Sequence, residues 1–235
     1  MNSIAERVQQ VRAHIAHAAQ VCQREPGDIT LLAVSKNHDV VRIRQALAAG
    51  CRHFGESYVQ EAVAKIEQLV DADLIWHFIG PVQSNKTQAI ARHFQWVHSV
   101  ERDKIAKRLH EQRPSGMPPL NVCIQVNLSG ESSKSGIAAG EVPALAGQIR
   151  QYANLRLRGL MTIGRQAADE TQLRQTFAEL RALLLELNSL GMSLDTLSMG
   201  MSGDLEAAIC EGATIVRVGT AIFGARQYPA QRTLG

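Results

Sequence analysis

The side chain in this sequence that is best placed for covalent chemistry is that of Lys36. It ends an apolar run, ITLLAVSK from Ile29 to Lys36, which is typical of a buried strand, and it shares the side-chain parity of Leu32 and Val34. A lysine that points among apolar neighbours at a strand end has its charged form disfavoured, so its free amine is available to form a Schiff base with an aldehyde. A solvated lysine, or one paired with a carboxylate such as Glu56, is the alternative interpretation.

A second group of polar residues, near the C-terminal end of the sequence, is suited to binding phosphate. The last apolar run contains Gly219, where a ligand can approach the backbone closely, and Thr220, which offers a hydroxyl. The run before it ends in Gly200-Met201-Ser202, just ahead of a predicted helix over 204–210 whose first amide groups also suit phosphate oxygens. Ser202 is equally consistent with an ordinary helix N-cap.

Arg217 has the same parity as Gly219 and is therefore expected to point to the inside of the fold. Val216 and Val218 should then face the opposite way, toward the helices. A guanidinium is permanently charged and only donates hydrogen bonds, so an interior Arg217 needs an acceptor. That acceptor is either a carboxylate partner or a ring nitrogen of a bound ligand.

A regular alternation of helices and strands positions these residues. A polar amphipathic helix comes first, with Ser3 and Glu6 as a capping box and apolar residues at steps of four and three between Ile4 and Cys22. Apolar runs then alternate with helices at 29–36, 53–58, 74–80, 96–100, 121–129, 155–164, 196–202 and 214–224. Such runs favour a parallel sheet covered by helices. An open doubly wound sheet is the competing architecture, although no GxGxxG fingerprint opens the first helix that follows a strand.

At this chain length the economical closure is a single (β/α)8 TIM barrel with an extra N-terminal helix, formed by residues 1–235 as one domain. In a barrel the C-terminal ends of the strands meet at one face, where the chemistry is carried out. The loops after the seventh and eighth strands are the common phosphate site of this fold. We therefore expect Lys36, Ser202, Arg217 and Thr220 to converge.

The composition disfavours several other classes of protein. The 235 residues are 45% hydrophobic, 20% charged and 4% aromatic, as in a globular protein that is soluble in water. Lys and Arg number 25 against 22 Asp and Glu and form no basic stripe, which argues against nucleic-acid binding. The N-terminus lacks the apolar core of a signal peptide, and no apolar stretch approaches about 20 residues, so we expect a cytoplasmic protein without a membrane partner.

The four cysteines, Cys22, Cys51, Cys123 and Cys210, lie far apart in the sequence. No CxxC pair is present, so the spacing indicates neither a zinc site nor a redox dithiol, and a reducing cytoplasm fits this pattern.

Other polar residues near strand ends carry no separate function in this interpretation. His77 is interpreted as a hydrogen-bonded barrel residue, because no second histidine or carboxylate lies at metal-ligand spacing. Lys86 and Lys134 are interpreted as solvated loop lysines, although Lys134 is also a second lysine that could reach an aldehyde. No Ser-His-Asp order or carboxylate pair can be assigned, so we predict no metal ligand and no catalytic residue.

A lysine on the first strand, Gly-Thr on the last and an inward arginine together match a site for pyridoxal 5′-phosphate, with a partner for its aldehyde, phosphate and ring nitrogen. Several long segments also resemble the pyridoxal phosphate homeostasis protein family. They are LLAVSKNH around Lys36, HFGESYVQE at 53–61, WHFIGPVQSNK at 76–86, LRGLMTIG at 157–164, LSMGMSGDLEAAI at 197–209 and VRVGTAIFGAR at 216–226. The resemblance extends in register over nearly the whole chain.

This resemblance implies a barrel like the N-terminal barrel of bacterial alanine racemase, with the cofactor carried as an aldimine on Lys36. By motif position, Ser202, Gly219 and Thr220 would hold the phosphate, and Arg217 would face the pyridine nitrogen.

Ser57 is the sixth expected cofactor-binding position and the one departure from the family pattern. The family usually has Asn in an FGENY motif, whereas this chain has FGESY. The hydroxyl of Ser57 reaches less far than an Asn side chain.

The resemblance also implies a role in storing, protecting or delivering pyridoxal phosphate without established turnover, with cofactor-dependent apoenzymes as recipients. Too few residues follow Gly224 for the second domain with which racemases supply an opposing acid or base, so we expect no racemase-type reaction and a monomer. An Arg217 that faces the ring nitrogen would also leave it unprotonated and a weaker electron sink. The alternatives are a racemase, decarboxylase or lyase that acts on amino acids through the same cofactor, and a lysine-dependent aldolase without one.

Overall fold

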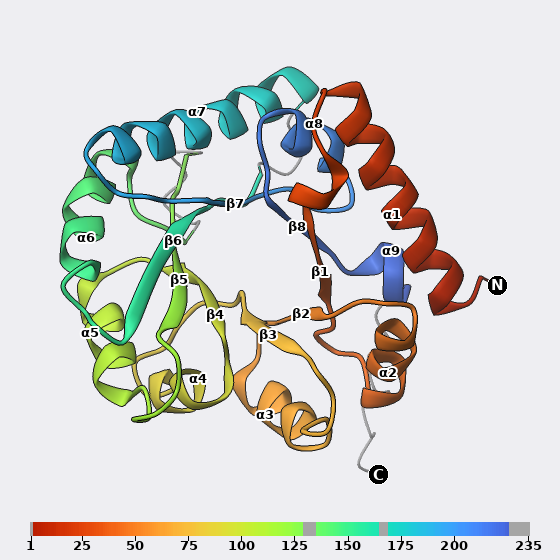
Figure 1. The fold of residues 1–235 in the computed structure, drawn as a ribbon, viewed down its shortest axis with the longest axis horizontal. Helices are drawn as coiled ribbons and strands as arrows, with labels where there is room; N and C mark the ends of the chain where they lie inside the picture. The colour runs from red at the N-terminus through yellow and green to blue at the C-terminus, as the bar shows by residue number, and fades with distance from the viewer. Residues whose placement is uncertain (1, 129–134, 165–168, 226–235) are drawn as a thin grey trace, which may run out of the picture.

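The strands of the computed structural model, which describes residues 2–128, 135–164 and 169–225, close into a barrel. All strands are parallel, each pairs with the next along the chain, and the last pairs with the first (Figure 1). The strands are β1 (Thr30–Val34), β2 (His53–Glu56), β3 (Ile75–Phe78), β4 (Trp96–Val100), β5 (Leu120–Gln125), β6 (Leu155–Met161), β7 (Thr196–Ser198) and β8 (Ile215–Val218). The predicted eight-stranded TIM barrel is confirmed.

Helices surround the barrel on its outer side (Figure 1). They are α1 (Ile4–Val21), α2 (Val40–Ala48), α3 (Val59–Glu67), α4 (Thr87–His93), α5 (Asp103–Gln112), α6 (Val142–Ile149), α7 (Glu170–Ser189), α8 (Leu205–Cys210) and α9 (Thr220–Phe223), with short 3-10 turns at Pro26–Asp28 and Ala139–Glu141.

The extra N-terminal helix, α1, begins with the predicted capping box. The hydroxyl of Ser3 accepts from the amide of Glu6 at 3.2 Å, and the Glu6 carboxylate accepts from the amide of Ser3 at 2.7 Å. These two bonds satisfy amides that the first helical turn leaves unpaired. The stripe that includes Val8 and Ile15 is buried, so α1 packs lengthwise beside α8 and α9 (Figure 1).

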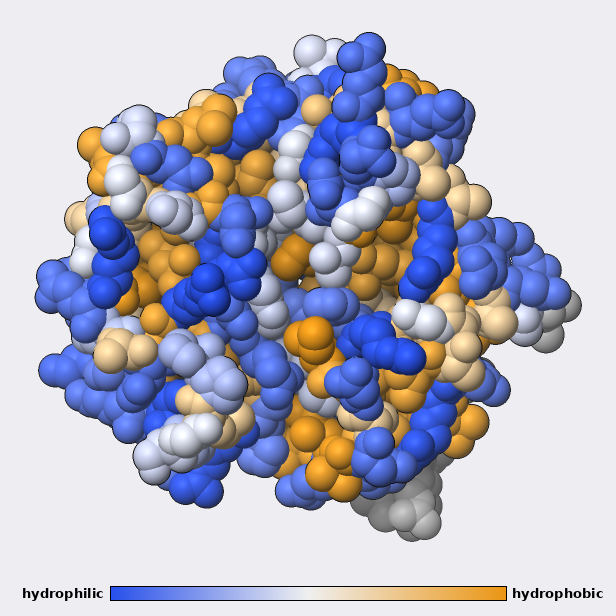
Figure 2. Space-filling view, viewed as in Figure 1, coloured by the Kyte–Doolittle hydropathy of each residue, from blue (hydrophilic) through white to orange (hydrophobic). Residues whose placement is uncertain are grey.

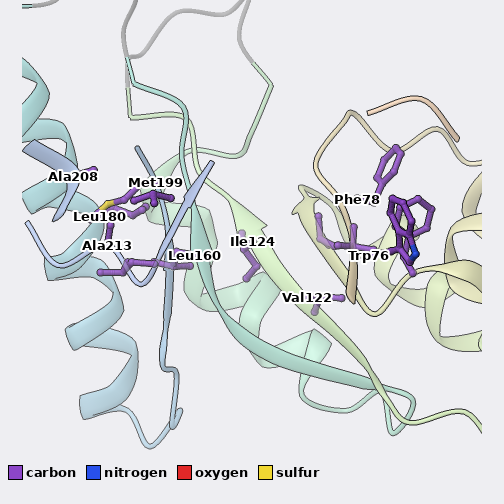
Figure 3. Close-up of a cluster of buried hydrophobic side chains, with 14 of the residues drawn as sticks. Trp76, Phe78, Val122, Ile124, Leu160, Leu180, Met199, Ala208 and Ala213 are labelled. Atoms are coloured by element: carbon purple, nitrogen blue, oxygen red, sulfur yellow. The ribbon is translucent and has the colours of Figure 1, made fainter. Parts of the chain in front are cut away.

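Alternation of side chains along the strands creates two hydrophobic cores. The inner cluster lies inside the barrel and contains Leu32, Trp96, Cys123, Met161 and Ile215. The outer cluster lies between strands and helices, and there Leu180 of α7 and Ala208 of α8 gather with Leu160 of β6 (Figure 3). Val216 and Val218 belong to the outer cluster, so the predicted parity of β8 is confirmed.

Two strand ends differ from the sequence prediction. The run over 214–224 is divided, because the backbone of Gly219 leaves the strand conformation at φ −111° and ψ −76° and α9 starts at Thr220. The first strand ends at Val34, so Lys36 lies in the loop beyond β1. The sequence predicted that strand parity sets the direction of the Lys36 side chain. This prediction does not hold, because Lys36 lies outside the strand.

Exposed hydrophobic side chains are scattered over the surface. On the face shown in Figure 2 they are interspersed with strongly hydrophilic residues. Val21, Val70 and Leu185, three of the most exposed, belong to different parts of the chain. Within the described ranges, none of the helices combines the length and the apolar character that crossing a membrane requires.

The structure joins Cys22 and Cys210 by a disulfide, a pairing that their spacing in the sequence did not indicate. Cys22 caps the C-terminal end of α1, Cys210 ends α8, and their Cα atoms are 5.1 Å apart. Their sequence separation of 188 does not keep them apart in space, because closure of the barrel brings α1 beside α8. Cys51 and Cys123 are free and buried.

Reduction of this disulfide is expected to lower the free energy of unfolding by about 2–4 kcal/mol, because the link restricts a long loop of the unfolded chain. Urea unfolding with and without dithiothreitol measures the change. The Cys22→Ser, Cys210→Ser double variant should behave like the reduced wild type in both buffers, whereas Cys51→Ser should still respond to the reductant. A wild-type midpoint that dithiothreitol leaves unchanged would contradict the prediction.

Candidate functional site

A cavity of about 290 Å³ opens among the loops that follow β1, β7 and β8. Five of the six residues expected to bind a cofactor line it: Lys36, Ser202, Arg217, Gly219 and Thr220. The lining is completed by Val34, His38, Ile79, Met201 and Gly203. The barrel therefore gathers residues that lie up to 186 positions apart in the sequence, from Val34 to Thr220, around one cavity.

One residue expected to bind the cofactor does not join this group. Ser57 is not among the residues that line the cavity. Its backbone packs tightly against the loop after β3, where a Cβ added to Gly80 would come within 2.3 Å of the Ser57 carbonyl oxygen. Lys134 lies outside the described residues.

The loop after β7 is shaped by one glycine and one carboxylate. Gly200 has φ +91°, and a Cβ there would lie 2.6 Å from the Cβ of Ala208, so a side chain fits neither the backbone nor the space. The amide of Met201 donates to Oδ1 of Asp204, and the amide of Asp204 donates to the Met201 carbonyl at 3.2 Å. Asp204 rather than Ser202 is the N-cap residue of α8, so Ser202 stays on the exposed tip of the loop.

Arg217 is buried at the floor of the cavity and is held by uncharged acceptors. Its Nη1 donates to the carbonyl of Ser198 at 2.6 Å and to the Ser198 hydroxyl at 2.8 Å, and its Nη2 donates to the carbonyl of Thr162 at 2.8 Å. Burial lowers the pKa of Arg217 to about 10, against the opposing effect of Asp204, so the guanidinium keeps its charge at neutral pH. Neither a carboxylate nor a ligand atom is needed to hold it in place.

A buried charge cluster that sequence reasoning missed supports the loop of Lys36. The hydroxyl of Ser35 donates to Oε1 of Glu56 at 2.7 Å. Nζ of Lys65 donates to the same oxygen at 2.7 Å, to the Ser35 carbonyl at 2.8 Å and to Glu61 at 2.5 Å. The carboxylate considered as a partner of Lys36 thus binds Lys65, and the i, i+4 spacing of Glu61 and Lys65 was the only sequence signal for this contact.

Glu56 depends on this cluster for its charge. It is fully buried, and burial raises its pKa while Lys65 and Ser35 act in the opposite direction. Its other oxygen, Oε2, has no hydrogen-bond partner among the described residues. The ammonium of Lys65 is therefore the main compensation for the charge of Glu56.

We expect Lys65→Met to lower the free energy of unfolding at about pH 7.5 by about 3–5 kcal/mol, because it leaves a buried carboxylate without a counter-ion. Because burial raises the pKa of Glu56 in the folded state, the folded protein carries an uncharged carboxyl group at low pH. The contribution of this uncharged form to the free energy of unfolding is lost as the pH rises through the folded-state pKa. The deficit should therefore be smaller at about pH 5. Urea unfolding at both pH values provides the measurement, with Lys107→Met, a change at an exposed lysine, as the matched control.

Adding Glu56→Gln to Lys65→Met should restore most of the stability lost at the higher pH, since a neutral amide replaces the orphaned charge. A deficit that is equal at both pH values, or that persists in the double variant, would show that Lys65 acts through packing alone.

A closed parallel barrel with a cavity among the loops after β1, β7 and β8 is consistent with the class of the alanine racemase N-terminal domain. This family, described as "Alanine racemase, N-terminal domain", matches residues 6–227. The chain is 60% identical over 230 residues to the pyridoxal phosphate homeostasis protein of Pseudomonas aeruginosa, covering 98% of this chain and 99% of that protein. It is 49% identical to the protein of the same name from Escherichia coli K12, covering 97% and 99%.

Among solved structures, PipY of Synechococcus elongatus PCC7942, determined with PLP bound, is similar with a TM-score of 0.85 and 39% identity. The match covers 94% of this chain and all of PipY. The chain therefore belongs to the alanine racemase N-terminal domain family and, within it, to the pyridoxal phosphate homeostasis proteins.

Proposed function

We propose that this protein binds pyridoxal 5′-phosphate as a Schiff base on Lys36 and serves PLP homeostasis without catalytic turnover of its own. As a single barrel domain over residues 1–235, it would store or protect the cofactor and deliver it to PLP-dependent apoenzymes, as a monomer in the cytoplasm. The names of the Pseudomonas aeruginosa and Escherichia coli relatives and the PLP bound to PipY support this proposal.

The observation that carries the proposal is the set of donors around the cavity. Lys36 offers a primary amine for an aldehyde, Ser202 and Thr220 offer hydroxyls for a phosphate, and Arg217 offers N–H groups for a ring nitrogen. At Gly219 a Cβ would lie only 3.3 Å from the Val34 carbonyl, so the ends of β8 and β1 lie close together. The aldehyde, the phosphate and the ring nitrogen of the cofactor would therefore each have a suitable partner among these residues.

The electrostatics of the cavity favour holding the cofactor over activating it. When bound, pyridoxal phosphate supplies an aldehyde and a pyridine ring that withdraws electrons most strongly when its nitrogen is protonated. Arg217 is charged and can only donate, so it would leave that nitrogen unprotonated.

His38 is the third titratable side chain in the described lining, besides Lys36 and Arg217. Burial, together with Arg42 and Lys65, lowers the pKa of His38, and its ring stacks on that of Phe223 with centroids 5.0 Å apart. His38 is therefore neutral at pH 7 and fixed in orientation.

The first experiment is the visible spectrum of the purified protein after addition of pyridoxal phosphate, before and after borohydride. We expect an absorption band that borohydride removes, with a pyridoxyl group on the peptide that contains Lys36 in mass spectrometry. Lys36→Ala should abolish both signals, while Lys107→Ala, at an exposed lysine of α5, should leave both intact. A protein that stays colourless and unmodified would refute the proposal and favour the lysine-dependent aldolase.

Turnover is tested by solvent exchange of the α-proton of L-alanine in deuterium oxide. We expect the loaded protein to exchange it no faster than an equal concentration of free pyridoxal phosphate, because the ring nitrogen facing Arg217 is a weak electron sink. Proton NMR follows the loss of the Cα–H signal. Faster exchange that Lys36→Ala abolishes would instead support an amino-acid racemase, decarboxylase or lyase.

A further inference from the structure

Three histidines form a hydrogen-bonded column through the inside of the barrel and end at Arg217. Nδ1 of His53 lies 2.9 Å from Nε2 of His77, and Nδ1 of His77 lies 2.8 Å from Nε2 of His98. Nδ1 of His98 lies 2.7 Å from the Ser198 hydroxyl, which also accepts from Nη1 of Arg217 at 2.8 Å. The residues of the column come from β2, β3, β4 and β7, and the column ends at Arg217, which lines the cavity.

Buried surroundings keep the histidines of the column uncharged. His77 and His98 are both fully buried, and the ring of His77 stacks on Trp96 of the inner cluster. Burial lowers the pKa of His53 and takes that of His77 well below its usual value. Burial together with the charge of Arg217 lowers the pKa of His98 to about 3. Each ring therefore carries one N–H at neutral pH.

The charge of Arg217 gives the column one direction. Because a guanidinium can only donate, the Ser198 oxygen must accept from Arg217. The hydroxyl proton of Ser198 then has a single acceptor among the described residues, Nδ1 of His98. With Nδ1 accepting, His98 carries its proton on Nε2 and donates to His77, which donates to His53 in the same way. The opposite direction would leave the buried Ser198 proton without an acceptor, which is costly.

The far end of the column opens at the other side of the barrel. His53 and His77 line a second hollow of about 420 Å³, with Trp96, Arg158 and Asp195 at its edge. This hollow shares none of its lining residues with the cavity around Lys36. The Nε2–H of His53 therefore has room for a solvent partner there, while the other end of the column is fixed by Arg217.

We propose that Ser198 and His98 are positioning residues for Arg217, and that Arg217 in turn fixes the Nε2–H tautomer on His98, His77 and His53. A guanidinium held in this way cannot turn away from the cavity, because Nη1 is bonded to both the carbonyl and the hydroxyl of Ser198. The consequence for cofactor binding rests on the proposed function, whereas the tautomer pattern is a property of the protein alone.

The tautomers are tested by NMR on the full-length protein without cofactor, labelled with ¹⁵N-histidine. Correlation of ring nitrogens with ring protons distinguishes a protonated Nε2 from a protonated Nδ1, and His53→Asn, His77→Asn and His98→Asn assign the signals. We expect Nε2–H on all three rings at neutral pH. Nδ1–H on these rings, or a mixture of the two tautomers, would overturn the proposed direction.

The positioning role is tested with Ser198→Ala. Loss of the hydroxyl should leave His98 as a mixture of tautomers and weaken pyridoxal phosphate binding roughly 3- to 10-fold, as expected for one buried hydrogen bond. Ser198→Thr, which keeps a hydroxyl, should restore the single tautomer. Thr196→Ala removes a hydroxyl from the same strand that bonds to Asp195 and not to the column, and should change neither readout.

A Ser198→Ala protein with unchanged His98 tautomer and unchanged affinity would overturn the positioning role. A wild-type protein that shows the expected tautomers but binds no pyridoxal phosphate would leave the column standing and refute only the proposed function. The two failures are therefore distinguishable.

Discussion

Closure of the sheet between β1 and β8 is the constraint on which the rest of the molecule depends. Leu32 pairs with Arg217 and Ala33 with Val218, so the first and last strands of the chain run side by side. This register places the loop of Lys36 next to the turn at Gly219 and assigns inner and outer faces to all strands at once. An open sheet would satisfy the same local propensities but would leave the two halves of the cavity far apart.

Two of the buried cations, Lys65 and Arg217, are accommodated by the fold in different ways. Lys65 is neutralised by the carboxylates of Glu56 and Glu61, a compact arrangement that fixes the backbone of Ser35 beside the cavity. Arg217 is surrounded by neutral carbonyl and hydroxyl oxygens and so keeps its positive charge unneutralised by direct contact. In the first arrangement the charge is paired with carboxylates, whereas the second leaves a charged donor in the lining of the cavity.

This difference agrees with a protein that holds its cofactor. A lysine amine near a strand end can bind an aldehyde reversibly, and hydroxyl and backbone donors can hold a phosphate without further chemistry. A permanently protonated donor that faces a pyridine nitrogen would oppose protonation of that nitrogen, on which carbanion chemistry depends. The guanidinium of Arg217 is held by the carbonyl and hydroxyl of Ser198 and by the carbonyl of Thr162, and the Ser198 hydroxyl in turn contacts His98.

The sequence by itself determined the alternation of strands and helices, the capping box of α1 and the inward parity of Arg217, because these follow from periodicity and from contacts within a few residues. It also predicted that Lys36 and Thr220 meet, since parallel strands share one C-terminal edge. Only the tertiary structure decided the acceptors of Arg217, the pairing of Cys22 with Cys210 and the column of histidines. Each of these joins side chains from separate strands or helices, and such contacts depend on the register and closure of the whole barrel, which no local pattern encodes.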